Sequence, residues 1–225
     1  MGIAKDLLLP DVTSVVAERY GIGCFLYESP LWSSDGAFIA YALGDLTGGG
    51  QTTWDVAVYD LAQKESTVLL NGNAFGPRYI AWVPKTHDLI FNARIIDRTG
   101  TSGFRRIDIA APGEQTLFFD DRGEELQPSV SADGSSPAYM QLDNGIGNIY
   151  TAYLADGSIK QLTRNQLTGS SPAWAPDGET IFFLFYGEGA FNIWSVDPDD
   201  GELVQLTFGT QDMYPFAGYM YALVP

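Results

Sequence analysis

The chain has 225 residues, of which 28 are acidic and 12 basic, so its formal net charge at pH 7 is −16. This charge argues against nonspecific binding to nucleic acid and to anionic membranes, because both present phosphate groups to a protein. One histidine and one cysteine exclude a metal site with two imidazoles and an internal disulfide. We therefore expect no metal, no cofactor, no nucleic-acid partner and no membrane insertion.

The N-terminal residues contain no apolar run as long as that of a signal peptide, and the sequence has none long enough for a membrane-spanning helix. As written, the chain is expected in the cytoplasm, or in the periplasm if an export signal has been removed. Two short segments, 4–9 and 12–17, are separated by a Pro-Asp pair and are predicted to be two strands joined by a turn.

After these runs a common frame recurs, in which one apolar run, a tight turn and a second apolar run follow each other. The copies lie at 29–41, 79–91, 127–139 and 171–183, with a truncated copy at 214–224. Three copies have Asp-Gly at the turn, and the pair suits a tight hairpin because both residues tolerate positive φ. The first run ends on Trp32, Trp82 or Trp174, which Val130 replaces in the third copy. Each frame predicts two antiparallel strands, A and B.

A second pair of runs recurs between the frames and predicts strands C and D. Its clearest copies lie at 148–163 and 192–207, each ending in Gln-Leu-Thr, and weaker copies lie at 55–70 and 104–119. Four β-branched or aromatic runs in roughly 40 to 50 residues are typical of a four-stranded propeller blade.

These residues resemble the repeats of the TolB-like, or PD40, class of WD40-like β-propellers. The fourth repeat follows the pattern of that family through Pro172, Trp174, Pro176, Asp177, Gly178, Ile193, Trp194, Gln205, Leu206 and Thr207. The resemblance implies an all-β propeller of four-stranded antiparallel blades, with Trp32, Trp82 and Trp174 buried at equivalent places. It implies no particular activity, because the repeated residues are structural.

Five frames predict one five-bladed propeller domain over 1–225, with blades beginning near 29, 78, 127, 171 and 214. The last frame supplies only strands A and B. The runs within 1–28 would supply its strands C and D and the first loop, and so close the ring and protect its edges. The alternative is an open five-repeat fragment of a longer propeller.

No catalytic signature emerges, so an enzyme is not the expected class. The sequence has no Gly-x-Ser-x-Gly elbow, and its one Cys-His pair, Cys24 and His87, is interpreted as a core thiol and a turn histidine. The acids at 197–202 lack the spacing of a calcium loop and are typical of a solvated turn. Asp55 occupies the place of Asn148 and Asn192, which favours a repeated structural hydrogen bond. The alternative function is a carbohydrate-binding or glycoside-cleaving propeller.

Arginines and acids are expected on opposite sides of the propeller, since the D–A and B–C loops lie on one side and the A–B and C–D turns on the other. Arginine and tyrosine are frequent in protein interfaces, so the loop side is the expected site for a protein partner or a multi-subunit complex. The candidate contact residues are Arg19, Arg78, Tyr79, Arg94, Arg98, Arg122, Arg164, Tyr186 and Tyr214. Alternatively, these arginines pair with neighbouring acids to fix the loops. The acidic side would serve solubility or meet a basic partner.

Overall fold

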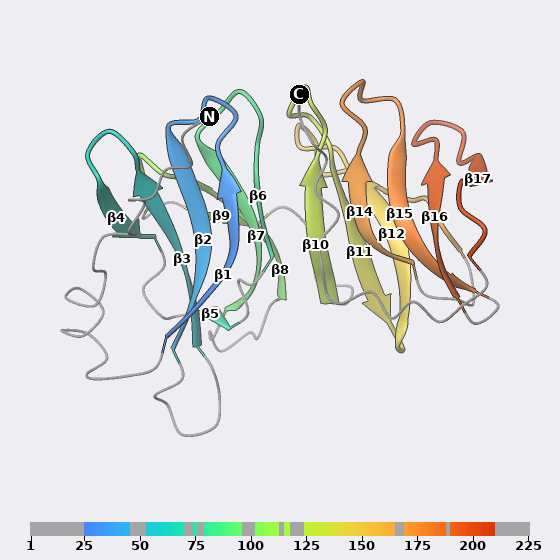
Figure 1. Cartoon of the computed structure of the whole chain (residues 1–225), viewed down its shortest axis with the longest axis horizontal. Helices are drawn as coiled ribbons and strands as arrows, with labels where there is room; N and C mark the ends of the chain where they lie inside the picture. The colour runs from blue at the N-terminus through green and yellow to red at the C-terminus, as the bar shows by residue number, and fades with distance from the viewer. Residues whose placement is uncertain are drawn as a thin grey trace.

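The computed structural model describes residues 25–45, 53–69, 74–75, 79–95, 102–112, 115–117, 124–164, 169–187 and 190–209. Over these ranges the regular elements are all β-strands, gathered into four sheets that stand side by side in chain order (Figure 1). None of these ranges contains a helix that could cross a membrane. The predicted fifth blade and the strands that would close the ring fall on 1–24 and 210–225, outside the described residues, so the blade count and the closure stay predictions.

Each sheet follows the predicted order A-B-C-D with antiparallel neighbours. Sheet 1 consists of β1 (Phe25–Trp32), β2 (Phe38–Asp45), β3 (Thr53–Asp60) and β4 (Glu65–Val68). Sheet 2 consists of β5 (Ala74–Phe75), β6 (Ile80–Trp82), β7 (Asp88–Ile95), β8 (Ser102–Asp108) and β9 (Gln115–Leu117). Its A strand is split, and both β5 and β6 pair with β7.

The other two sheets repeat this plan without the split. Sheet 3 consists of β10 (Glu124–Val130), β11 (Pro137–Asp143), β12 (Ile146–Ala152) and β13 (Ile159–Gln161). Sheet 4 consists of β14 (Gly169–Trp174), β15 (Ile181–Gly187), β16 (Ala190–Val196) and β17 (Leu203–Gln205). The prediction of four-stranded antiparallel units without helix is confirmed for the described part of the chain.

In sheets 1, 3 and 4 the proline inside the A strand is accommodated by a bulge. The pairing of β10 with β11 shifts register between Leu126 and Ser129, and that of β14 with β15 shifts between Ser170 and Ala173. A bulge leaves one residue out of the hydrogen-bond ladder, so a proline without an N–H is tolerated there. A shift at the same place in β1 shows that the Pro position of the repeat marks a bulge in three of the sheets.

The Gln-Leu-Thr motif fastens strand D to strand C. The Thr163 hydroxyl accepts a bond from the Ile149 N–H at 2.9 Å and donates to the Asn148 side-chain oxygen at 3.3 Å. Sheet 4 repeats the pattern, with Asn192 accepting from Thr207 at 3.2 Å. The interpretation of the Asn position as a repeated structural hydrogen bond is therefore confirmed in these two sheets.

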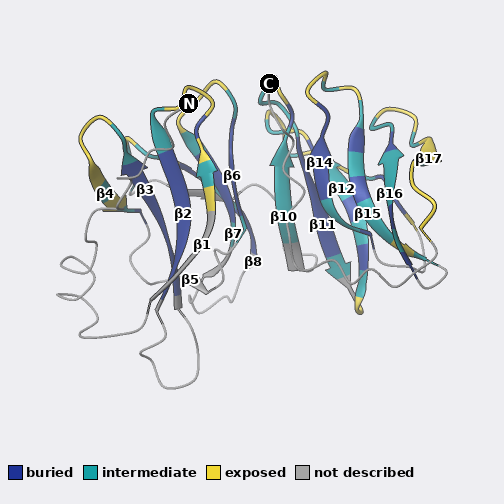
Figure 2. Ribbon diagram, viewed as in Figure 1, coloured by how far each residue is buried: buried dark blue, intermediate teal, exposed yellow. Residues whose placement is uncertain are grey.

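Apolar side chains fill the joints between neighbouring sheets, and Figure 2 shows the buried residues along the inner strands. Trp82 and Trp174 are buried as predicted. The expected burial of Trp32 is wrong, because 59% of this residue is exposed. Trp82 and Trp174 each pack against the sheet that precedes them in the chain, whereas among the described sheets none precedes the sheet of Trp32.

Candidate functional site

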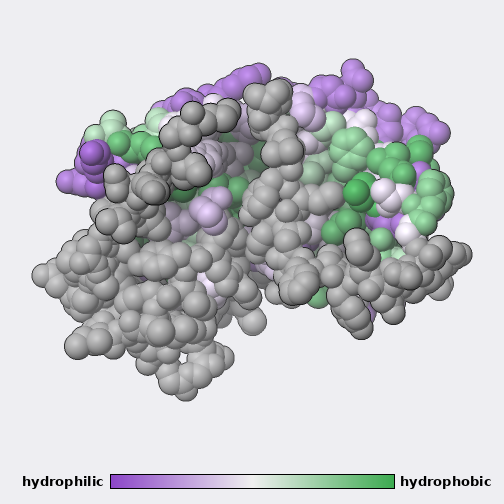
Figure 3. Space-filling view, viewed as in Figure 1, coloured by the Kyte–Doolittle hydropathy of each residue, from purple (hydrophilic) through white to green (hydrophobic). Residues whose placement is uncertain are grey.

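The described A–B and C–D turns all lie at the same ends of the strands, uppermost in Figure 1, and we call this the hairpin side. Figure 3 shows hydrophilic residues along the hairpin side. The turns here contain Asp35, Asp60, Asp108, Asp133, Asp156, Asp177, Asp197, Asp199 and Asp200. The expected gathering of acids on one side is seen in the described turns.

Many of these carboxylates are held by the backbone of their own turn. Asp133 Oδ1 accepts from the Ser131 hydroxyl at 2.6 Å and the Ser135 N–H at 3.0 Å, and Asp35 accepts from Ser33 and Ala37 at the same distances. Asp197 Oδ1 accepts from the N–H groups at positions 199 and 200. Asp and Asn commonly stabilise turns in this way. The segment 197–202 is therefore the predicted hairpin turn, with its first carboxylate engaged by its own backbone.

Hydrogen bonds to the charged form lower the pKa of three carboxyl groups in these turns. The Ser131 hydroxyl, and then the Ser135 N–H, hold the pKa of Asp133 below its ordinary value. Ser158 lowers the pKa of Asp156 in the same way, and Ser33 followed by His87 lowers that of Asp35. His87 lies in the A–B turn of sheet 2 as predicted, and its Nε2 lies 2.8 Å from Asp35 Oδ2 in sheet 1.

Replacing Ser131 by alanine is expected to raise the pKa of Asp133 toward its ordinary value of about 3.9, because the donor with the largest effect is removed. A lowered pKa stabilises the fold above the unfolded-state value, and the stabilisation is lost as the pH falls through the folded value. The part of the stability difference between wild type and S131A that comes from Asp133 should therefore vanish in acid, whereas the loss of the bond from the Ser136 N–H to the Ser131 hydroxyl remains at every pH. Carboxyl NMR titration measures this, with the Asp156 signal as the internal control. An unmoved Asp133 midpoint would contradict the assignment.

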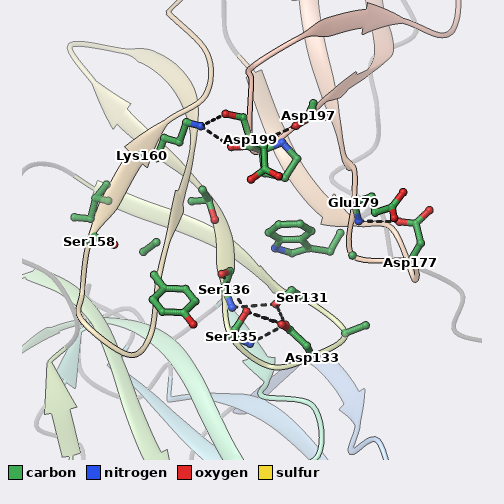
Figure 4. A pocket seen from close by; sticks show the side chains of 18 of the residues that line it. Ser131, Asp133, Ser135, Ser136, Ser158, Lys160, Asp177, Glu179, Asp197 and Asp199 are labelled. Carbon is green, nitrogen blue, oxygen red and sulfur yellow. Dashed lines mark hydrogen bonds between the residues drawn. The ribbon is translucent and has the colours of Figure 1, made fainter.

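A groove opens on the hairpin side between sheets 3 and 4, with a volume of about 1010 Å³. Its walls carry the carboxylates of Asp133, Asp177, Glu179, Asp197 and Asp199 and the ammonium group of Lys160 (Figure 4). Lys85 of sheet 2 also lines the groove. Lys160 reaches across from sheet 3, and its Nζ donates to the main-chain oxygens of Pro198 and Asp199 at 2.8 and 2.5 Å. The groove is therefore polar, and acids outnumber bases around it.

Trp174 also lines the groove, and 6% of this residue is exposed. Its indole N–H is buried and has no hydrogen-bond partner among the described residues. A buried donor without a partner is costly and rare in native structures. A hydrogen-bond acceptor delivered through the groove would relieve this cost.

The repeat has known relatives over most of its length. The PD40 family, described as the TolB beta propeller domain, matches residues 24–217. The chain belongs to the PD40 family. The dipeptidyl-peptidase 5 of Porphyromonas gingivalis is 27% identical over 101 residues, which are 42% of this chain and 15% of that protein. The expected family membership is thus confirmed.

Solved structures agree on the fold. TolB from Acinetobacter baumannii superposes with a TM-score of 0.63 at 20% identity, over 82% of this chain and 44% of that one. A puromycin-hydrolysing peptidase of Mycobacterium tuberculosis superposes with a TM-score of 0.63 at 12% identity, over 81% of this chain and 29% of that one. This PD40 chain therefore spans less than half the length of each of these relatives.

The predicted arginine-tyrosine surface is only partly covered by the structure. Residues outside the described ranges are Arg19, Arg78, Arg98, Arg122 and Tyr214, and Arg94 is described in its backbone alone. Tyr186 lies in β15 of sheet 4, whereas Tyr79 immediately precedes β6 of sheet 2 and Arg164 follows β13 of sheet 3. Arg164 is exposed, and the Tyr186 ring, 39% exposed, lies 4.8 Å from that of Phe191. This surface stays a prediction.

The groove between sheets 3 and 4 was not predicted. The sequence predicted the side on which its carboxylates lie. It did not indicate which joint between blades would be open, because the repeat is similar at every joint. One residue carries a signal that distinguishes this joint, since Ser136 stands where the first repeat has Phe38.

Proposed function

We propose that this PD40 chain is a non-catalytic propeller that binds a protein partner through the hairpin side of its blades. The observation that carries the proposal is the preformed groove of about 1010 Å³ on the hairpin side. Its Asp133 and Asp197 carboxylates are fixed by their own turns. A surface that is ordered before binding loses little conformational entropy on association. The loop side with Arg164 and Tyr186 is the second surface on which a partner is proposed to lie.

A catalytic role receives less support from the groove. A glycoside hydrolase needs one carboxylic acid whose pKa is raised so that it can protonate the leaving group. The pKa of the groove carboxyl Asp133 is instead lowered, first by the Ser131 hydroxyl and then by the Ser135 N–H. Asp133 is therefore charged at neutral pH, which suits recognition of a cation better than proton donation.

Carbohydrate binding is the second candidate. The groove wall holds the hydroxyls of Ser131, Ser135 and Ser158 beside the indole of Trp174, and hydroxyls and aromatic rings are the groups that bind sugars. However, the Ser131 and Ser135 hydroxyls already donate to Asp133, so they keep only acceptor capacity for a sugar.

The test is copurification of the tagged full chain from its native source, followed by reconstitution with the purified partner and calorimetry. We expect a stoichiometric protein complex. The triple variant D177N/D199N/D200N should bind at least about tenfold more weakly, with a nearly unchanged melting temperature because the three side chains are exposed. Arg164→Glu is the matched variant on the loop side.

Loss of affinity in R164E alone would move the contact to the loop side. A chain that binds no protein but is retained on a glycan array would contradict the proposal and favour the carbohydrate alternative.

A further inference from the structure

The joints between sheets 1 and 2 and between sheets 3 and 4 offer a matched comparison within one molecule. In both A–B turns the first residue donates its N–H to a carbonyl five residues later, Ser33 to Phe38 and Ser131 to Ser136, each at 2.9 Å. Phe38 and Ser136 are therefore structurally equivalent. Trp82 and Trp174 likewise end the A strand of the following sheet.

Both tryptophans are buried, but only at the first joint is the indole donor used. The rings of Phe38 and Trp82 lie 6.4 Å apart, and the Trp82 indole N–H donates to the Leu31 carbonyl at 3.0 Å. At the joint of sheets 3 and 4, Ser136 supplies no ring and the Trp174 N–H has no partner in the described part of the chain. The groove lies over the position that a phenylalanine fills in sheet 1.

The charges around this space favour a cation. Five carboxylates and two ammonium groups line it, and Lys160 is already bonded to two main-chain oxygens. Asp177 accepts from Glu179 N–H through Oδ1 at 3.0 Å, which leaves Oδ2 for a ligand, since a carboxylate has about four acceptor positions. Figure 4 shows Asp177 and Asp133 on turns of the two neighbouring sheets.

We propose that this groove binds an arginine-bearing peptide segment, with the guanidinium between the turn carboxylates and a main-chain carbonyl accepting from the Trp174 indole. A guanidinium pairs with carboxylates through its planar fork of donors and stacks on aromatic rings. A peptide supplies the cation and the carbonyl acceptor together, which a metal ion or a simple polyamine does not. The inference rests on the proposed protein-binding function and names the chemistry of the segment bound.

The probe is a fluorescein-labelled, end-blocked hexapeptide with two adjacent arginines, titrated with the full chain and followed by anisotropy. The matched probe has citrulline in place of arginine, which keeps the shape and removes the charge. We expect the citrulline peptide to bind at least about tenfold more weakly. Equal binding of both peptides would overturn the proposal, and so would full displacement of the arginine peptide by equimolar spermine.

Four variants locate the site. D177N should weaken binding about tenfold, whereas E65Q, an equal change of charge on an exposed residue of sheet 1, should change it less than about twofold. W174F keeps an aromatic ring but loses the donor and should weaken binding roughly three- to tenfold. S136F adds the ring present in sheet 1 and should abolish binding, with circular dichroism confirming that the variant is folded.

Equal losses of peptide affinity in D177N and E65Q would show that only long-range electrostatic attraction is involved, and would contradict a binding site at Asp177. If the copurified partner binds D177N and S136F as tightly as wild type, this inference fails while the proposed function stands. If no protein partner is found at all, the proposed function fails, and the peptide titration still decides whether the groove recognises arginine.

Discussion

Replacing Trp82 with alanine is expected to lower the free energy of unfolding by about 3–5 kcal/mol, the usual cost of truncating a large buried aromatic residue. Trp82 is 8% exposed and packs in the joint between sheets 1 and 2, beside Phe38. Its removal leaves a cavity and deprives the Leu31 carbonyl of the indole donor. Urea denaturation followed by circular dichroism measures the loss.

The matched control is Trp32→Ala, at the equivalent place in sheet 1. Because 59% of Trp32 is exposed, its replacement should cost less than about 1 kcal/mol. Equal costs at both positions would mean that Trp32 is covered in solution. A small cost at Trp82 would contradict the packing of the tryptophan into the joint between the first two sheets.

The second large effect is expected at the leucine of the Gln-Leu-Thr motif. Leu162 is 7% exposed and packs in the core between sheets 3 and 4 with Trp174 and Ile149. Leu162→Ala should cost about 2–5 kcal/mol, because the lost methyl groups leave a cavity that the sheets cannot close. Thermal and urea unfolding with matched baselines would measure it.

Leu206 is the same residue of the same motif in sheet 4, but 44% of it is exposed. We expect Leu206→Ala to cost less than about 1 kcal/mol. An equal cost at Leu162 and Leu206 would show that another segment covers the outer face of sheet 4 in solution. The predicted closing blade would produce that result, so this pair of variants also tests the ring closure that lies outside the described residues.

The sequence by itself determined the class of fold and the unit of repetition. Asp-Gly turns, β-branched runs and the Gln-Leu-Thr motif act within one sheet, through bonds such as Thr163 to Ile149. Local interactions of this kind are visible in a sequence because the partners recur at fixed spacing. The same reasoning correctly placed the turn acids on one side, since successive turns of an antiparallel sheet lie at alternate ends of its strands.

Only the tertiary structure decided which copies of a motif are buried and where a groove opens. Trp32 and Trp82 look alike in sequence, yet their exposure differs because a neighbouring sheet covers only one of them among the described sheets. The groove is lined by Ser136 of sheet 3 and Trp174 of sheet 4, two residues about one repeat apart in the chain. Burial and cavities depend on which side chains face each other across a joint between sheets. A repeat pattern within one chain does not contain that information.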